Sequence, residues 1–134
     1  MAFDPQTRLL AGSRILAPLL NYAGFGFEPG EVSDEGHSAE GRFVAGDRAI
    51  ELRYQWGLAE VRFRVGDWVL EHAEYMRLLG VEESSSLLAE RHEIESEGFE
   101  ALLEDLTRFA AEFLAGDAQR FCALAAQAEC RAVA

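Results

Sequence analysis

The sequence predicts an α+β fold, in which an antiparallel β-meander of about four strands carries N-terminal and C-terminal helices packed on one face. Three observations predict it. Apolar and charged residues alternate over residues 50–65, the period of a half-buried strand. Gly46 and Gly66, each followed by aspartate, interrupt this pattern and suit type II′ hairpin turns. Apolar residues recur at i, i+3, i+4 and i+7 over residues 99–113, as on an amphipathic helix.

Asp4 and Pro5 mark the start of the first predicted helix. Asp4 can accept hydrogen bonds from the first free backbone N–H groups, and Pro5 suits the first helical position. The apolar stripe that follows consists of Leu9, Leu10, Ile15, Leu16, Leu19 and Leu20. Pro18 lies late in this stripe, so we expect the helix to kink there or to end near Ala17.

The next residues predict a break and then a loop. The run Gly24-Phe25-Gly26-Phe27 interrupts any helix. We expect its two phenylalanines to hold the connection against the core; the alternative is a glycine-hinged binding loop. Residues 28–41 combine acidic side chains, turn residues and His37, which is typical of an exposed, mobile loop.

The meander follows, with four expected strands: Arg42–Ala45, Arg48–Trp56, Ala59–Val65 and Trp68–Leu70.

The second and third of these strands have two candidate registers. A two-residue turn places Arg53 opposite Arg62, and like charges directly opposite each other are unfavourable. A wider turn over residues 55–58 places Arg53 opposite Glu60 and Glu51 opposite Arg62. Charge favours the wider turn by about 0.5 kcal/mol per pair, whereas turn statistics favour the tight one. We expect the wider turn.

Three further segments complete the predicted fold. Residues 71–79 form a short helix that ends at Gly80. In residues 82–98, either the serines at 84–86 cap a short helix through Leu87, Leu88 and Ile94, or the segment is a loop. The amphipathic helix from Phe99 to Phe113 ends at Gly116, and Asp117 caps a last helix. The apolar positions of that last helix are Phe121, Cys122, Leu124, Ala125 and Ala128.

Length and composition limit the class of protein. With 134 residues, the chain is long enough for one domain with a real core. No apolar run approaches the ~18 residues of a membrane span. Asp4 and Pro5 stand where a signal peptide would be basic, so we expect a cytoplasmic protein. Cys122 and Cys130 lie about 12 Å apart if helical, too far for a disulfide, so we expect them to be reduced.

The charge of the chain is acidic and local. The net charge is −12, and all 12 basic residues are arginine, a usage that suggests a GC-rich bacterial genome. Residues 28–40 hold five acidic and no basic side chains, and residues 82–105 hold nine acidic side chains and one arginine. Such a chain repels nucleic acid and anionic membranes.

No stretch carries a catalytic or ligand-binding motif of any specificity, so we assign no catalytic residue and expect no metal and no cofactor. His92 lies among glutamates but lacks the second histidine of H-E-x-x-H. His72 stands at the end of the last strand, close in sequence to Glu74 and Tyr75. These three residues are the candidates for a pocket with general acid–base chemistry, although a helix-start histidine beside a sheet edge is the simpler interpretation.

The candidate partner-binding residues are Arg53, Arg62 and Arg64 on the polar face of the hairpin and Glu90, Glu93 and Glu97 in the second acidic segment. The simpler interpretation of the arginines is a solvated face with cross-strand ion pairs. Trp56 and Trp68 flank strand ends and are expected in the core; an exposed tryptophan there would be a binding hot spot.

The layout of helix, antiparallel strands and helices in a small acidic chain resembles two bacterial groups, secretion chaperones and toxin-neutralising immunity proteins. The resemblance rests on layout and charge alone. It implies a non-enzymatic module that binds another protein, one with a basic or amphipathic surface. Two alternatives remain: a small-ligand-binding protein or enzyme with a pocket near His72, and a structural homodimer whose sheet edge pairs with its copy.

Overall fold

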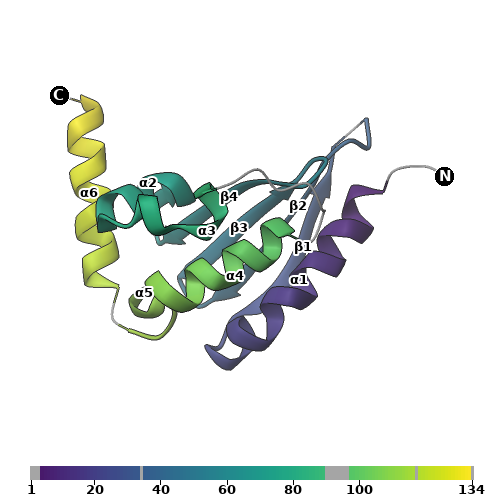
Figure 1. Ribbon diagram of the computed structural model, residues 1–134, viewed down its shortest axis with the longest axis horizontal. Helices are drawn as coiled ribbons and strands as arrows, with labels where there is room; N and C mark the ends of the chain where they lie inside the picture. Colours follow the sequence, from purple (N-terminus) through teal and green to yellow (C-terminus); the bar gives the residue numbers. More distant parts are fainter. Residues whose placement is uncertain (1–3, 34, 90–96, 117, 134) are drawn as a thin grey trace.

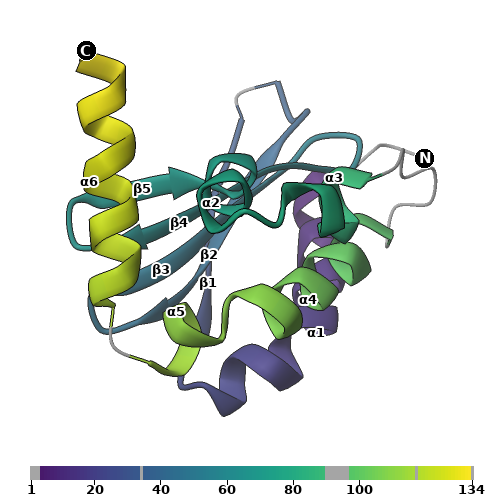
Figure 2. The same ribbon diagram turned by 60° about the vertical axis from the view of Figure 1, so that its left-hand side comes forward.

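The computed structural model describes residues 4–33, 35–89, 97–116 and 118–133. It confirms the α+β prediction, with a single antiparallel sheet in the order β1-β2-β3-β4-β5. Figure 1 shows helices α1 and α4 side by side across one face of this sheet. In Figure 2, α6 stands at the β5 end of the sheet. None of the described helices covers the face opposite α1 and α4.

Helix α1 (Pro5–Tyr22) begins as predicted. The Asp4 carboxylate accepts hydrogen bonds from the backbone N–H groups of Gln6 and Thr7 at 3.1 and 3.3 Å. The prediction that the helix ends near Ala17 is wrong, because it continues past Pro18 to Tyr22. Pro18 removes a single backbone hydrogen bond one turn before the natural end of the helix, and its ring lies at the exposed surface.

The sheet consists of β1 (Gly26–Val32), β2 (Ala39–Ala45), β3 (Arg48–Tyr54), β4 (Leu58–Val65) and β5 (Trp68–Glu71). Gly46 and Gly66 have φ angles of 61° and 57°, as the first residue of a type II′ turn requires. The wider register between β3 and β4 is confirmed, since Arg53 lies opposite Glu60 and Glu51 opposite Arg62. The charged pairs therefore agree with the observed register.

The prediction of a loop over residues 28–41 is wrong for residues 28–32, which belong to β1, and for residues 39–41, which belong to β2. Pro29 and Gly30 argue against a central strand, but β1 is an edge strand, where a proline N–H is not needed. Phe27 packs on Phe43, with ring centroids 5.0 Å apart, and its ring lies over Gly41. A Cβ on Gly41 would stand only 2.6 Å from that ring, so the glycine makes room for the close approach of Phe27.

After the sheet, α2 (His72–Leu79) ends at Gly80 in the left-handed conformation, as predicted. A 3-10 turn (Glu82–Ser84) leads to α3 (Ser86–Ala89). The Ser85 Oγ accepts a hydrogen bond from the N–H of Leu88 at 3.3 Å, so the capped-helix alternative holds for this stretch. The predicted position of Ile94 lies outside the described residues.

The single helix predicted over residues 99–113 is two helices, α4 (Glu97–Phe109) and α5 (Ala111–Ala115). Ala110 departs from helical geometry with φ −106° and ψ 18°. This change of direction brings Phe113 against Phe63, with centroids 5.2 Å apart, and lets Arg48 donate a hydrogen bond to the carbonyl of Phe113 at 2.7 Å.

The last helix, α6 (Gln119–Val133), packs on β5. Gly116 ends α5 as predicted, and the capping role predicted for Asp117 lies outside the described residues. Cys122 is a free, half-buried thiol, and the side chain of Cys130 lies outside the described part.

The core fills the space between the sheet and the helices. In it, the rings of Tyr75 and Phe113 contact each other and both contact Phe63 and Phe121. The two tryptophans are not in it. Trp56 is 70% exposed and Trp68 is 37% exposed. Trp56 has a φ of 60°, so the chain has already left the strand at that position. Among the described helices, none combines the length and the apolar character needed to cross a bilayer.

Candidate functional site

The sheet face that carries no helices, here called the open face, has an ordered pattern of charge. One row crosses all five strands and alternates in sign, because each member lies opposite the next: Glu28, Arg42, Glu51, Arg62 and Glu71. A second row, Glu40, Arg53 and Glu60, lies parallel to it on the three central strands. Period-two alternation puts both rows on the same side of the sheet, and the apolar residues between them point to the core.

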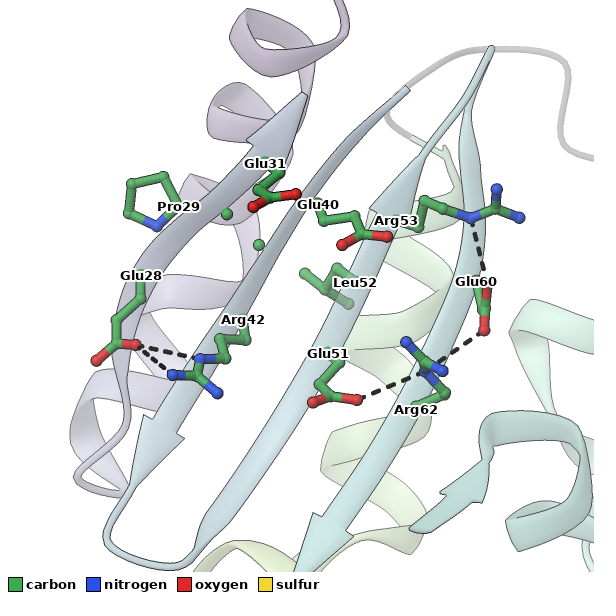
Figure 3. A pocket seen from close by; sticks show the side chains of 12 residues that line it. Glu28, Pro29, Glu31, Glu40, Arg42, Glu51, Leu52, Arg53, Glu60 and Arg62 are labelled. Atoms are coloured by element: carbon green, nitrogen blue, oxygen red, sulfur yellow. Dashed lines mark hydrogen bonds and ion pairs between the residues drawn. The ribbon is translucent and has the colours of Figure 1, made fainter. Parts of the chain in front are cut away.

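Ion pairs connect these rows (Figure 3). Arg53 contacts Glu60 at 3.2 Å, and Arg62 lies 3.5 Å from Glu51 and 3.4 Å from Glu60. Arg64 contacts Glu51 at 3.1 Å. The three arginines predicted as partner-binding residues are thus brought together, but each already has a carboxylate. Partly exposed pairs of this kind contribute at most about 1 kcal/mol each to folding.

A shallow trough of about 460 Å³ runs along the open face. Its charged lining is Glu28, Glu31, Glu40, Arg42, Glu51, Arg53, Glu60 and Arg62, which is five carboxylates against three guanidinium groups. Glu31 and Glu40 supply the excess. Within the described part of the chain, neither carboxylate has an ion-pair partner, and Figure 3 shows no interaction drawn to either. The trough is therefore net acidic at its β1–β2 side.

Of the three glutamates predicted in the second acidic segment, Glu97 is described by the structure, and it does not lie on this face. Glu97 is the first residue of α4, which packs on α1 and α3 and so lies with the layer of helices that covers the other side of the sheet. Glu90 and Glu93 lie outside the described residues. The segment also contains a residue that is not on the surface at all, Asp105, which is 1% exposed.

Asp105 is the centre of a buried polar cluster with His72 and Ser85. Its Oδ2 lies 2.9 Å from His72 Nε2 and accepts a hydrogen bond from Ser85 Oγ at 2.5 Å. Its two oxygens also accept the backbone N–H groups of Ser86 and Leu87 at 2.7 and 3.2 Å. The carboxylate therefore joins α2, the start of α3 and α4.

The order of the three side chains in this Asp105 cluster decides its chemistry. In a serine nucleophile triad, histidine lies between serine and carboxylate, so that it can take the serine proton. Here the carboxylate lies between the other two, and Ser85 is fully buried. The arrangement anchors helices and does not activate a nucleophile. Sequence patterns did not identify the Asp105 cluster, because Asp105 stands next to exposed Glu104 and resembles one more acidic surface residue.

The pKa of Asp105 reflects these contacts. Burial alone would raise the pKa of the carboxyl, but the hydrogen bonds from His72, Ser85 and the two backbone N–H groups outweigh it and hold the pKa below its ordinary value. The carboxylate stays ionised, and its charge is satisfied by donors.

The three residues of the pocket alternative have different surroundings. His72 lines a hollow between β4, α2 and α3, but Glu74 and Tyr75 do not line it. Glu74 forms an ion pair with Arg77 on the outer side of α2. Tyr75 is buried in the aromatic core, where burial and nearby Glu112 raise the pKa of its hydroxyl to about 12. A phenol with that pKa stays neutral near pH 7, and the structure does not bring the three side chains to one hollow.

Two further observations concern metal ligands and similarity to known proteins. In the part of the chain that the structure describes, no three histidine, cysteine, aspartate or glutamate side chains come together as a set of metal ligands. Searches against protein-family models, curated proteins and solved structures gave no match.

Proposed function

We propose that this chain is a non-enzymatic module that binds another protein, and that its open face receives a basic segment of that partner. One observation carries the proposal. Among the described residues, one sheet face carries no helix and bears an ordered charge array, in which the carboxylates of Glu31 and Glu40 at one side of a trough have no ion-pair partner. Cations from a partner would pair with these two groups without breaking the existing ion pairs.

The net charge of −12 supports the same kind of partner. An acidic protein attracts a basic one over several ångströms before contact, which speeds their encounter. Arginine and lysine side chains are the groups that carboxylates pair with at interfaces, and a second acidic copy of this chain would instead be repelled.

The homodimer alternative depends on a free strand edge, and both edge strands are poorly suited to pairing. Strand β1 contains Pro29 and an irregular register between Pro29 and Val32, and it carries Glu28 and Glu31. Strand β5 has four residues and is followed directly by a helix. Proline, charge, irregularity and shortness are the usual means by which proteins prevent edge pairing.

Site-specific photo-crosslinking in cells tests the proposal. A photoreactive phenylalanine analogue is placed at position 29, an exposed and uncharged position in the lining of the trough, or, as the matched control, at position 100 on the exposed side of α4. We expect position 29 to give a discrete adduct with a protein of net positive charge that also binds this chain after purification. Position 100 should give no such adduct. Equal adducts from both positions, or an adduct with an acidic protein, would contradict the proposal.

A further inference from the structure

We propose that the hollow between β4, α2 and α3 receives an apolar side chain from a partner segment whose neighbouring residues are basic. This inference rests on the proposed function, because the same segment would place its cations on the open face. It adds an apolar side chain to the features of the partner segment, and a second contact site to the surface of this chain.

The lining of the hollow suits an apolar side chain. Six apolar residues contribute to it: Leu58, Ala59, Val61, Ala73, Leu87 and Leu88. Leu88 is 41% exposed, which makes it one of the few large apolar side chains at the surface of the described part. The volume is about 250 Å³. A cavity of about 150 Å³ lined by apolar groups can hold a benzene molecule, so this hollow has room for a leucine or an aromatic ring.

The charge around the hollow favours basic residues next to the apolar side chain of the partner segment. Among the described residues, Glu60 and Glu71 contribute to its lining and no arginine does. His72, also in the lining, directs Nε2 to Asp105. A segment with basic residues on either side of an apolar one therefore complements the site.

The hollow and the trough on the open face lie on either side of β4. Glu60 lines both of them. Along an extended segment, successive side chains point to opposite sides. A segment that crosses β4 near Glu60 could thus place an apolar side chain in the hollow and its basic neighbours against the carboxylates.

The wall that carries Leu87 and Leu88 is held in place from behind. Helix α3 has four residues, too few to be stable by itself. The Asp105 carboxylate binds the N–H groups of Ser86 and Leu87 and so fixes the start of this helix. Figures 1 and 2 both show α3 close to α2, with which it encloses the hollow. A wall that is already ordered costs less conformational entropy when a ligand binds.

Two synthetic nonapeptides test the inference by isothermal titration calorimetry: one alternates arginine and leucine, the other arginine and serine. We expect the arginine–leucine peptide to bind wild-type protein at least about tenfold more tightly, the effect of burying one leucine side chain. Leu88→Ser should abolish this preference. Leu10→Ser, which changes a comparably exposed leucine on α1, should leave it unchanged. In the wild type, backbone amide resonances of residues 73, 87 and 88, which line the hollow and not the trough, should shift with the arginine–leucine peptide only.

The outcomes separate the two proposals. Equal affinity of both peptides, or equal loss of preference in Leu88→Ser and Leu10→Ser, would overturn the apolar site. If the arginine–serine peptide still binds and Glu31→Arg with Glu40→Arg weakens it, the open-face proposal stands alone. If neither peptide binds, both proposals fail.

Discussion

At the scale of single residues, Asp105 shows how much one buried carboxylate can organise. It accepts four hydrogen bonds from two parts of the chain, His72 and residues 85–87, that are both far from it in sequence. A buried charge is tolerated only when donors satisfy it. Its helix has an apolar stripe that is easily recognised, but periodicity cannot distinguish a buried polar residue from an exposed one. The sequence therefore predicted the helix and not the Asp105 cluster.

Asp105→Asn should lower the free energy of unfolding by about 3 kcal/mol at pH 7, because an amide offers one acceptor oxygen where the carboxylate offers two. Urea denaturation measures this. Glu104→Gln is the matched control, since that neighbour is exposed, and should change stability by less than about 0.5 kcal/mol. A loss of stability as small as that of the control would show that the carboxylate is not the anchor we describe.

The difference in stability between the wild type and Asp105→Asn should also depend on pH. The pKa of Asp105 is lower in the folded chain than in the unfolded one. Its contribution to stability is therefore complete above the unfolded pKa of about 3.9 and is lost as the pH falls through the folded pKa. The difference in stability between wild type and Asp105→Asn should shrink below about pH 4. A difference that stays constant from pH 7 to pH 2 would contradict the assigned shift.

Leu106→Ala should cost about 2–5 kcal/mol, as truncation of a buried leucine does. Leu106 is buried in the centre of the core-facing stripe of α4. Thr107→Ala, on the exposed side of the same helix, provides the control. A loss under about 1 kcal/mol for Leu106→Ala in thermal or urea melting would mean that α4 does not face the core as described.

At the scale of elements, the sequence predicts those whose patterns are local. The β3–β4 register could be predicted from opposite charges alone, and the caps at Asp4 and Gly80 from residue type. Strand β1 could not, because Pro29 and Gly30 oppose a strand unless the segment is known to lie at a sheet edge. The break at Ala110 could not either. It exists because Phe113 packs against distant Phe63, a tertiary contact that no local pattern contains.

In the turn between β3 and β4, Trp56 has a left-handed backbone conformation with a φ of 60°. Its side chain is 70% exposed. For an L-residue, this conformation costs about 1–2 kcal/mol. Asparagine tolerates it, so Trp56→Asn should raise the free energy of unfolding by about 0.5–1 kcal/mol. Gln55→Asn, a neighbouring exposed position, should not. Loss of more than about 1 kcal/mol in Trp56→Asn would show that the indole itself stabilises the fold.

At the scale of the whole molecule, the fold divides one sheet between two tasks. One face builds the core with the helices, and the other displays charge. The acidic surplus of the chain could be predicted from composition, but its place could not. Of the two acidic segments, residues 28–40 contribute to the open face, whereas in the described part of 82–105 one acid is buried and Glu97 lies in the helical layer. The candidate site therefore depends on topology, which brings five strands into one register.

The association rate between this chain and the partner captured at position 29 tests the central claim most directly. Stopped-flow measurements compare wild type with two variants of equal charge change: Glu31→Arg with Glu40→Arg on the open face, and Glu83→Arg with Glu100→Arg on the helical side. At low salt we predict that the open-face variant associates about tenfold more slowly than the helical-side variant. The difference should nearly vanish at 1 M salt, where the Debye length falls to about 3 Å. Equal association rates for the two variants at low salt, with both folded by circular dichroism, would contradict docking on the open face.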